Sequence, residues 1–334
     1  MKIKLTTIIS LLLIMISVHG QSKINTPSFE ELVNSFNIDN SLIIIGEAHE
    51  IKGTYSTQLD IISHLMQKGR STILIEGGNS EAAILNEYLQ TKNIELLNYT
   101  RARGKNYRKL ITGIEELSNE YTVKFVGVDF ERPVCLEYLF KKWFLNIENS
   151  NLDKIKNELL SISPNSKEKN IKKILVKIKE SYQDYKSELT ELLGDDFRIF
   201  EDIINNLVFQ SDRGISSKRR DTGVANNVTA LETKELKESI LIFGSNHLTH
   251  KNHLGSKIGK SFKDDMEILP ILFSYKNCTN YQKNSQYSSS TPLINYMKDN
   301  LEDDPKISFS IEKNEVLSPH ERSNRFILVS LKNL

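Results

Sequence analysis

Two short turns in this sequence each end in a histidine. Gly46-Glu47-Ala48-His49 and Gly244-Ser245-Asn246-His247 share the spacing Gly-x-x-His, and each follows a run of apolar residues. A histidine held at the end of a strand suits a general base or a metal ligand, because imidazole exchanges a proton near neutral pH. One such turn is usually a surface feature. Its recurrence after a second apolar run indicates that His49 and His247 serve one site.

Acidic residues follow apolar runs in the same way. Glu47 lies inside the first turn, Glu76 follows the run 72–75, and Asp129 follows the run 123–128. A carboxylate at the end of an apolar strand is either a helix cap or a buried acid that needs a partner. We favour the site interpretation for Glu76, and for Asp129 on weaker grounds. Arg220, at the start of a predicted helix, is a candidate to hold a substrate carboxylate or an oxyanion.

The elements around these residues predict an α/β fold. Short β-branched runs bounded by turn residues are typical of buried strands, and amphipathic helical segments separate at least the first two. Strands joined through helices are parallel neighbours, so their carboxyl ends open on one edge of the sheet, where ligands bind. We therefore predict a mainly parallel sheet flanked by helices, with the site at its carboxyl edge. The candidate catalytic residues are Glu47, His49, Glu76, Asp129, Arg220 and His247. His250 and His253 follow closely as candidate rim residues.

A helical segment interrupts the α/β pattern. From about residue 136 to residue 213 the chain is rich in Lys and Glu and has apolar residues at helical spacing. We predict that residues 21–334 form a single α/β domain with this stretch as an inserted helical subdomain. The sequence leaves open whether the insertion is a lid or a solvated hairpin. Its aromatic residues, which could line an apolar ligand pocket or pack the insertion onto the sheet, include Tyr138, Phe140, Trp143, Phe144, Tyr182 and Tyr185.

Residues 1–20 have the pattern of an export signal. Lysines precede the apolar segment 8–18, and small residues precede a cleavage point at Gln21. We therefore expect an exported protein, periplasmic or secreted, with no membrane segment after cleavage, and we retain an uncleaved anchor as the alternative. Export permits a disulfide between Cys135 and Cys278, although two separate buried thiols fit equally well.

The composition argues against nucleic-acid binding. The 334 residues include 44 basic and 43 acidic ones, for a formal net charge of +1, whereas a nucleic-acid binder would carry a clustered basic surplus. With 39% hydrophobic residues the chain can form a substantial core. The sequence also lacks the Gly-x-Ser-x-Gly motif of ordinary serine hydrolases. We expect a small-molecule substrate as the partner, and the oligomeric state stays open.

The turns around Glu47 and Glu76 resemble those of the erythromycin esterase-like proteins. That family shares a superfamily with the haem-binding ChaN lipoproteins and the Tiki/TraB proteases. The resemblance covers most of residues 41–273 except the helical stretch, through segments 45–50, 74–78, 86–89, 126–129, 220–228 and 244–247. The second turn departs from the erythromycin esterases, because it lacks the first histidine of their usual His-Asn-x-His pattern. In this respect the turn resembles the ChaN and Tiki/TraB branches more closely.

The residues and the resemblance together imply a hydrolase of an ester, lactone or related acyl bond. In this hypothesis His49 takes a proton from water, Glu47 or Glu76 orients its imidazole, and His247 and Arg220 stabilise the oxyanion. A variant places a divalent metal ion between His49, Glu76 and His247.

The superfamily also implies alternatives to this hydrolase. One is an exported haem- or metal-binding protein of the ChaN type, for which Tyr55 and His49 would be the residues to test. Another is a metal-dependent protease of the Tiki/TraB type. The sequence alone does not say whether a metal or haem is bound.

Overall fold

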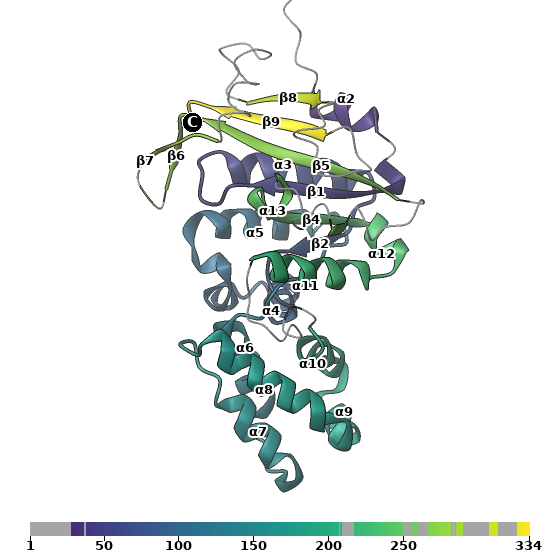
Figure 1. Ribbon diagram of the computed structural model, residues 1–334, viewed down its shortest axis with the longest axis vertical. Coiled ribbons are helices and arrows are strands. Elements are labelled where there is room, and N and C mark those ends of the chain that lie inside the picture. The colour runs from purple at the N-terminus through teal and green to yellow at the C-terminus, as the bar shows by residue number, and fades with distance from the viewer. Residues whose placement is uncertain are drawn as a thin grey trace, which may run out of the picture.

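A parallel sheet forms the centre of the computed structural model (Figure 1). Within the described residues, seven strands lie in the order β3-β2-β4-β1-β5-β9-β8; six are parallel, and β8 is antiparallel to β9. The strands are β1 (Ser41–Glu47), β2 (Thr72–Ile75), β3 (Lys124–Gly127), β4 (Ser239–Gly244), β5 (Glu267–Lys276), β8 (Ile307–Glu312) and β9 (Phe326–Lys332). A separate hairpin pairs β6 (Cys278–Asn280) with β7 (Ser285–Tyr287). The described residues are 28–36, 38–206, 208, 217–249, 254, 257–258, 266–281, 283, 285–289, 307–312 and 326–334. The predicted α/β fold is confirmed.

Both faces of the sheet are covered, which explains why its strands are continuously apolar. Along β1, Ile43 and Ile45 face one apolar cluster, and Leu42 and Ile44 face the other. The first cluster includes residues of α2 (Phe29–Asn34), α3 (Thr54–Gln67), α4 (Asn79–Thr91) and α5 (Lys105–Leu117). The second includes residues of α11 (Ser217–Thr229), α12 (Thr233–Lys237) and α13 (Asn246–Thr249).

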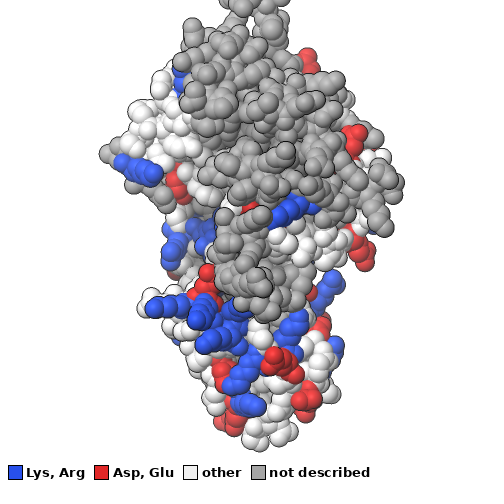
Figure 2. Space-filling view, viewed as in Figure 1, with Lys and Arg blue, Asp and Glu red and all other residues white. Residues whose placement is uncertain are grey.

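The chain between β3 and α11 is helical where it is described. It contains α6 (Pro133–Phe144), α7 (Asp153–Leu160), α8 (Glu168–Ser181), α9 (Lys186–Leu193) and α10 (Phe197–Ile204). These helices extend the molecule past α4 at the lower end of Figure 1. Their surface mixes Lys and Arg side chains with Asp and Glu (Figure 2). Residues 209–213 of the predicted insertion lie outside the described residues.

Aromatic side chains fill the interior of this helical stretch. Phe140, Trp143, Phe144 and Phe200 contact one another at ring-centroid distances of 6.0–6.5 Å. Tyr138 instead packs against a tyrosine of the 3₁₀ turn Ile94–Tyr99, at 4.5 Å. The contacts of Phe140, Trp143 and Phe144 therefore lie within the helical stretch and stabilise it.

The two ends of the helical stretch are held at one place. The buried carboxylate of Glu131, just before α6, accepts hydrogen bonds from the backbone N–H groups of Asn79 and Ser80 at 2.9 Å each. Asn206, just after α10, donates from Nδ2 to the same carboxylate at 2.8 Å and to the carbonyl of Asp129 at 2.7 Å. One carboxylate thus joins the start of α4 to the entrance and the exit of the helical stretch.

The two cysteines are separate buried thiols. Cys135 donates from Sγ to the carbonyl of Tyr99 at 3.1 Å, and Cys278 donates to the carbonyl of Leu331 at 3.3 Å. Among the described residues, no helix combines the length and the apolarity that crossing a membrane requires. The predicted signal, residues 1–20, lies outside the described residues.

We predict that Gly127→Ala lowers the free energy of unfolding by about 1–3 kcal/mol, because a new side chain cannot be accommodated in this packed core. A Cβ at Gly127 would lie 2.1 Å from the carbonyl carbon and oxygen of Gly78, and backbone atoms cannot rotate away. Gly104→Ala is the matched control, since its nearest neighbours would be at 3.5 and 3.7 Å. Urea unfolding measures both variants. Equal destabilisation in the two would contradict this packing.

Candidate functional site

The two histidine turns meet at the carboxyl edge of the sheet. Neighbouring strands β1 and β4 are in register so that Glu47 pairs with Gly244. A Cβ built on Gly244 would lie 3.5 Å from His247 Cδ2, 3.6 Å from Glu76 Oε2 and 3.7 Å from His49 Nε2. The ends of β1, β2 and β4 therefore bring three of the sequence-predicted side chains around one point.

His49 lies between two carboxylates. Its Nδ1 is 2.7 Å from Glu47 Oε1, and its Nε2 is 3.3 Å from Glu76 Oε2. Burial lowers the pKa of His49, but the hydrogen bonds and charges of Glu47 and Glu76 outweigh it and raise that pKa to about 10. The imidazole therefore carries both ring protons at neutral pH. About half of its side chain, 46%, is exposed to solvent.

Glu76 is the most heavily contacted acid of the site. Its Oε2 accepts a hydrogen bond from the Gly244 N–H at 3.0 Å, and its Oε1 accepts one from Arg220 Nη2 at 2.8 Å. Arg101 Nη1 lies 3.9 Å from Oε2. Burial alone would raise the pKa of Glu76, but His49, Arg101 and Arg220 hold it well below its usual range. Glu76 is therefore a buried anion surrounded by donors.

Asp129 pairs with Arg220 and is not accessible from solvent. It is fully buried and accepts hydrogen bonds from Arg220 Nε at 2.9 and 3.1 Å and from Nη2 of the same arginine. The guanidinium carbon of Arg220 also lies 5.1 Å from the centre of the Phe130 ring. Arg220 is thus fixed between Asp129 and Glu76, and the expectation that it reaches an oxyanion receives no support from these contacts.

His247 pairs with an acid that the sequence analysis did not select. Its Nδ1 is 2.6 Å from Oδ1 of Asp221, and Asp221 is fully buried. An acid at the start of a helix already has a local explanation in the helix dipole, which is why the pattern did not single it out. One feature of the sequence could have indicated Asp221, namely its position directly after the candidate Arg220. The two consecutive residues of α11 contact different parts of the site, since Arg220 bonds Glu76 and Asp221 bonds His247.

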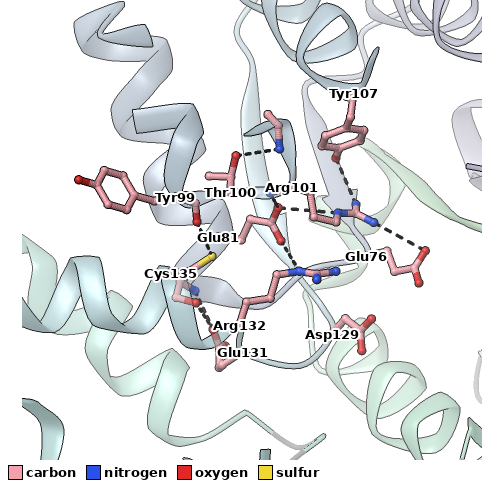
Figure 3. A network of polar contacts seen from close by, with 12 residues as sticks. Glu76, Glu81, Tyr99, Thr100, Arg101, Tyr107, Asp129, Glu131, Arg132 and Cys135 are labelled. Carbon is pink, nitrogen blue, oxygen red and sulfur yellow. Dashed lines mark hydrogen bonds and ion pairs between the residues drawn. The ribbon is translucent and has the colours of Figure 1, made fainter. Parts of the chain in front are cut away.

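Arg101 is the second residue that the sequence analysis missed. It belongs to the 3₁₀ turn Arg101–Arg103, where no strand or helical periodicity announces it. Its Nη2 donates to the hydroxyl of Tyr107 at 3.2 Å, and its guanidinium lies 4.8 Å from the centre of that ring. Figure 3 shows Arg101 extending from this turn toward Glu76.

The donor set does not fit the metal variant of the hypothesis. Among the described residues, no group of three His, Cys, Asp or Glu side chains is arranged to hold a metal ion. Both nitrogens of His49 are engaged by carboxylates, and Glu76 is already neutralised by His49, Arg220 and Arg101, whose positive charges disfavour a divalent cation there.

Tyr55 does not fit an iron ligand for haem either. It is buried, its hydroxyl accepts a hydrogen bond from the Glu50 N–H at 3.3 Å, and its pKa is raised by burial and by the charge of Glu47. A phenolate, which is the form that would ligate iron, is disfavoured there. His250 and His253 lie outside the described residues.

The fold of this protein is similar to that of several solved structures. No protein-family model matches the chain, and no curated protein matches it in sequence. Similar solved structures include a Bacillus cereus protein, with a TM-score of 0.60 and 14% identity over 92% of both chains. A variant of the erythromycin esterase EreC in its open conformation has a TM-score of 0.59 and 14% identity over 90% of this chain and 92% of that one. A succinoglycan biosynthesis protein has a TM-score of 0.59 and 14% identity over 92% of this chain and 91% of that one. The fold implied by the resemblance is therefore confirmed, since the likeness to erythromycin esterase extends over nearly the whole chain.

We predict that His49 keeps both ring protons well above neutral pH. In ¹⁵N-detected NMR, its nitrogens titrate near pH 10, because Glu47 and Glu76 stabilise the charged ring. Glu47→Gln lowers that pKa because it removes one of the two charges. The folded-state pKa exceeds the value of about 6.5 for an unfolded chain, so this stabilisation is complete below about pH 6.5 and is lost as the pH rises through about 10.

His64 of α3 is the internal control for this titration. Burial lowers its pKa from the ordinary histidine value, so its signals shift at a lower pH than those of His49. A His49 ring that titrates together with His64 would contradict the arrangement of the two carboxylates.

Proposed function

We propose that this protein is a hydrolase of an ester, lactone or related acyl bond. The observation that carries the proposal is the convergence of His49, His247 and Glu76 around Gly244, with each histidine paired to a buried acid. Hydrolysis by activated water needs a base held in one orientation and a positive group for the developing oxyanion. The fold likeness to an erythromycin esterase supports the same class of reaction. Residues 1–20 support the further proposal that the protein is exported.

In our proposed mechanism His247 takes the proton from water. Asp221 accepts from Nδ1 of His247 at 2.6 Å, which is the relation of histidine to aspartate in a catalytic triad. This hydrogen bond fixes the tautomer in which Nε2 carries the lone pair. The sequence alone assigned the base role to His49, but a ring with a pKa of about 10 between two carboxylates is protonated at neutral pH and is a poor acceptor.

His49 then has the opposite task. As water attacks the acyl carbon, the carbonyl oxygen becomes negative, and the positive charge of the His49 imidazolium stabilises it. The tetrahedral intermediate collapses when His247 returns its proton to the leaving oxygen, which gives the acid and the alcohol. Glu47 and Glu76 are positioning residues in this scheme, because they keep His49 charged and in place.

The test is a screen of the full chain against esters and lactones, followed by substitution. We expect His247→Gln to lower kcat/KM for a confirmed substrate by about 10²–10⁴-fold, since it removes the base, and Asp221→Asn to lower it as well. His64→Gln, in a helix outside the site, is the matched control and keeps the activity of the unmodified protein. A His247→Gln protein that retains full activity would overturn the mechanism.

The pH dependence separates the two histidines. If His49 acts as a cation, we expect kcat/KM to fall as the pH rises through about 10, because the ring loses its charge there. If His49 were instead the base, the rate would rise with pH up to about 10. Initial rates measured between pH 7 and 10.5 on a substrate that is stable to alkali decide between the roles.

A further inference from the structure

Beside the histidine pair, six side chains form a closed ring of contacts. In order around the ring they are Glu81, Arg101, Glu76, Arg220, Phe130 and Arg132. Glu76 belongs both to this arginine ring and to the proposed catalytic site, where its Oε2 is 3.3 Å from His49 Nε2. The ring therefore adjoins the place where we expect the acyl bond to lie.

Glu81 holds the first half of the arginine ring. It is fully buried, and its Oε1 accepts a hydrogen bond from the backbone N–H of Arg101 at 2.8 Å and lies 3.7 Å from Nε of that residue. Its Oε2 accepts from Nε of Arg132 at 3.0 Å. Both arginines are thus fixed by one carboxylate, and Figure 3 shows their guanidinium groups directed to the same side, toward Glu76 and Asp129.

Phe130 closes the second half. Its ring centre lies 5.1 Å from the guanidinium carbon of Arg132 and 5.1 Å from that of Arg220. Arg220 in turn bonds Glu76, which stands 3.9 Å from Arg101. The aromatic ring therefore places two cations on one wall without bringing another acid between them.

The arginines of this ring keep hydrogen-bond donors unused. Each guanidinium has five N–H groups. Within the described residues, Arg132 uses its Nε alone, and its two terminal nitrogens have no protein acceptor. Arg101 leaves Nε buried without a hydrogen bond, and its Nη1 is too far from Glu76 to form one. Only 27% of the Arg132 side chain and 18% of that of Arg101 are exposed, so these donors lie in a sheltered place rather than in open solvent.

The unused N–H groups of the arginine ring favour an anion of low charge. Arg101, Arg132 and Arg220 are balanced by Glu76, Glu81 and Asp129, so the ring has no net charge and attracts a ligand through these donors, which could not compensate the second charge of a dianion. A carboxylate carries one charge, and its planar pair of oxygens matches the fork of a guanidinium. We propose that the arginine ring binds a carboxylate carried by the substrate, so that the enzyme hydrolyses esters or lactones of acidic molecules. The choice of substrate rests on the proposed hydrolase function, whereas the binding of a carboxylate does not depend on it.

Binding of hexanoate and of hexanamide, measured by isothermal titration calorimetry on the full chain, tests the arginine ring. The two probes have the same length and differ in charge, and neither contains an ester or a lactone bond. We expect saturable binding of hexanoate at least about tenfold tighter than that of hexanamide, since a charged hydrogen bond is lost with the amide. Arg132→Gln should remove that preference, and Arg132→Lys, which keeps the charge without the fork, should retain part of it.

Arg103→Gln is the matched control. Arg103 is an exposed arginine of the same 3₁₀ turn as Arg101 and stands outside the arginine ring, so its substitution leaves hexanoate binding unchanged. Thermal melting by circular dichroism confirms that each variant is folded. Equal affinity of the unmodified protein for both probes, or equal loss in the Arg132 and Arg103 variants, overturns the proposal. Because the experiment measures binding and not turnover, its result is independent of whether the protein hydrolyses esters.

Discussion

The buried carboxylate of Glu76 is the charge on which the site depends. An unpaired anion at this depth would cost several kcal/mol, and here it is compensated by four groups from different parts of the chain. The Gly244 N–H comes from β4, His49 from the turn after β1, Arg220 from α11 and Arg101 from a 3₁₀ turn. Elements that are far apart in sequence are thus held together by one common partner at the end of β2.

The same arrangement decides the protonation of its neighbours. Glu76 is ionised because cations surround it, and His49 is charged because the carboxyl groups of Glu47 and Glu76 raise its pKa. His247 has a different environment, since Asp221 is the acid at its Nδ1. Two histidines with the same local spacing in sequence therefore stand in different electrostatic surroundings. That difference is the physical basis for giving them different roles in the proposed reaction.

The sequence predicts the sheet and part of the site well, because both leave local signals. Fully buried strands appear as short apolar runs, and the residues that follow them come together once the strands are parallel, as His49, Glu76 and His247 do. Arg101 and Asp221 leave no such signal. A 3₁₀ turn has no periodicity, and an acid in a first helical turn is expected for local reasons. The sequence pattern also could not predict that Arg220 points toward Asp129, because this orientation depends on the packing of α11 against the end of β3.

The carboxylate of Glu131 has a consequence for how this architecture can vary. The helical stretch enters the domain beside Glu131 and leaves it at Asn206, and a hydrogen bond joins these two residues. The same carboxylate holds the first turn of α4. The chain between the two residues is thus a closed loop with a common anchor. A change in its length or composition would leave this attachment, and with it the carboxyl edge of the sheet, where it is.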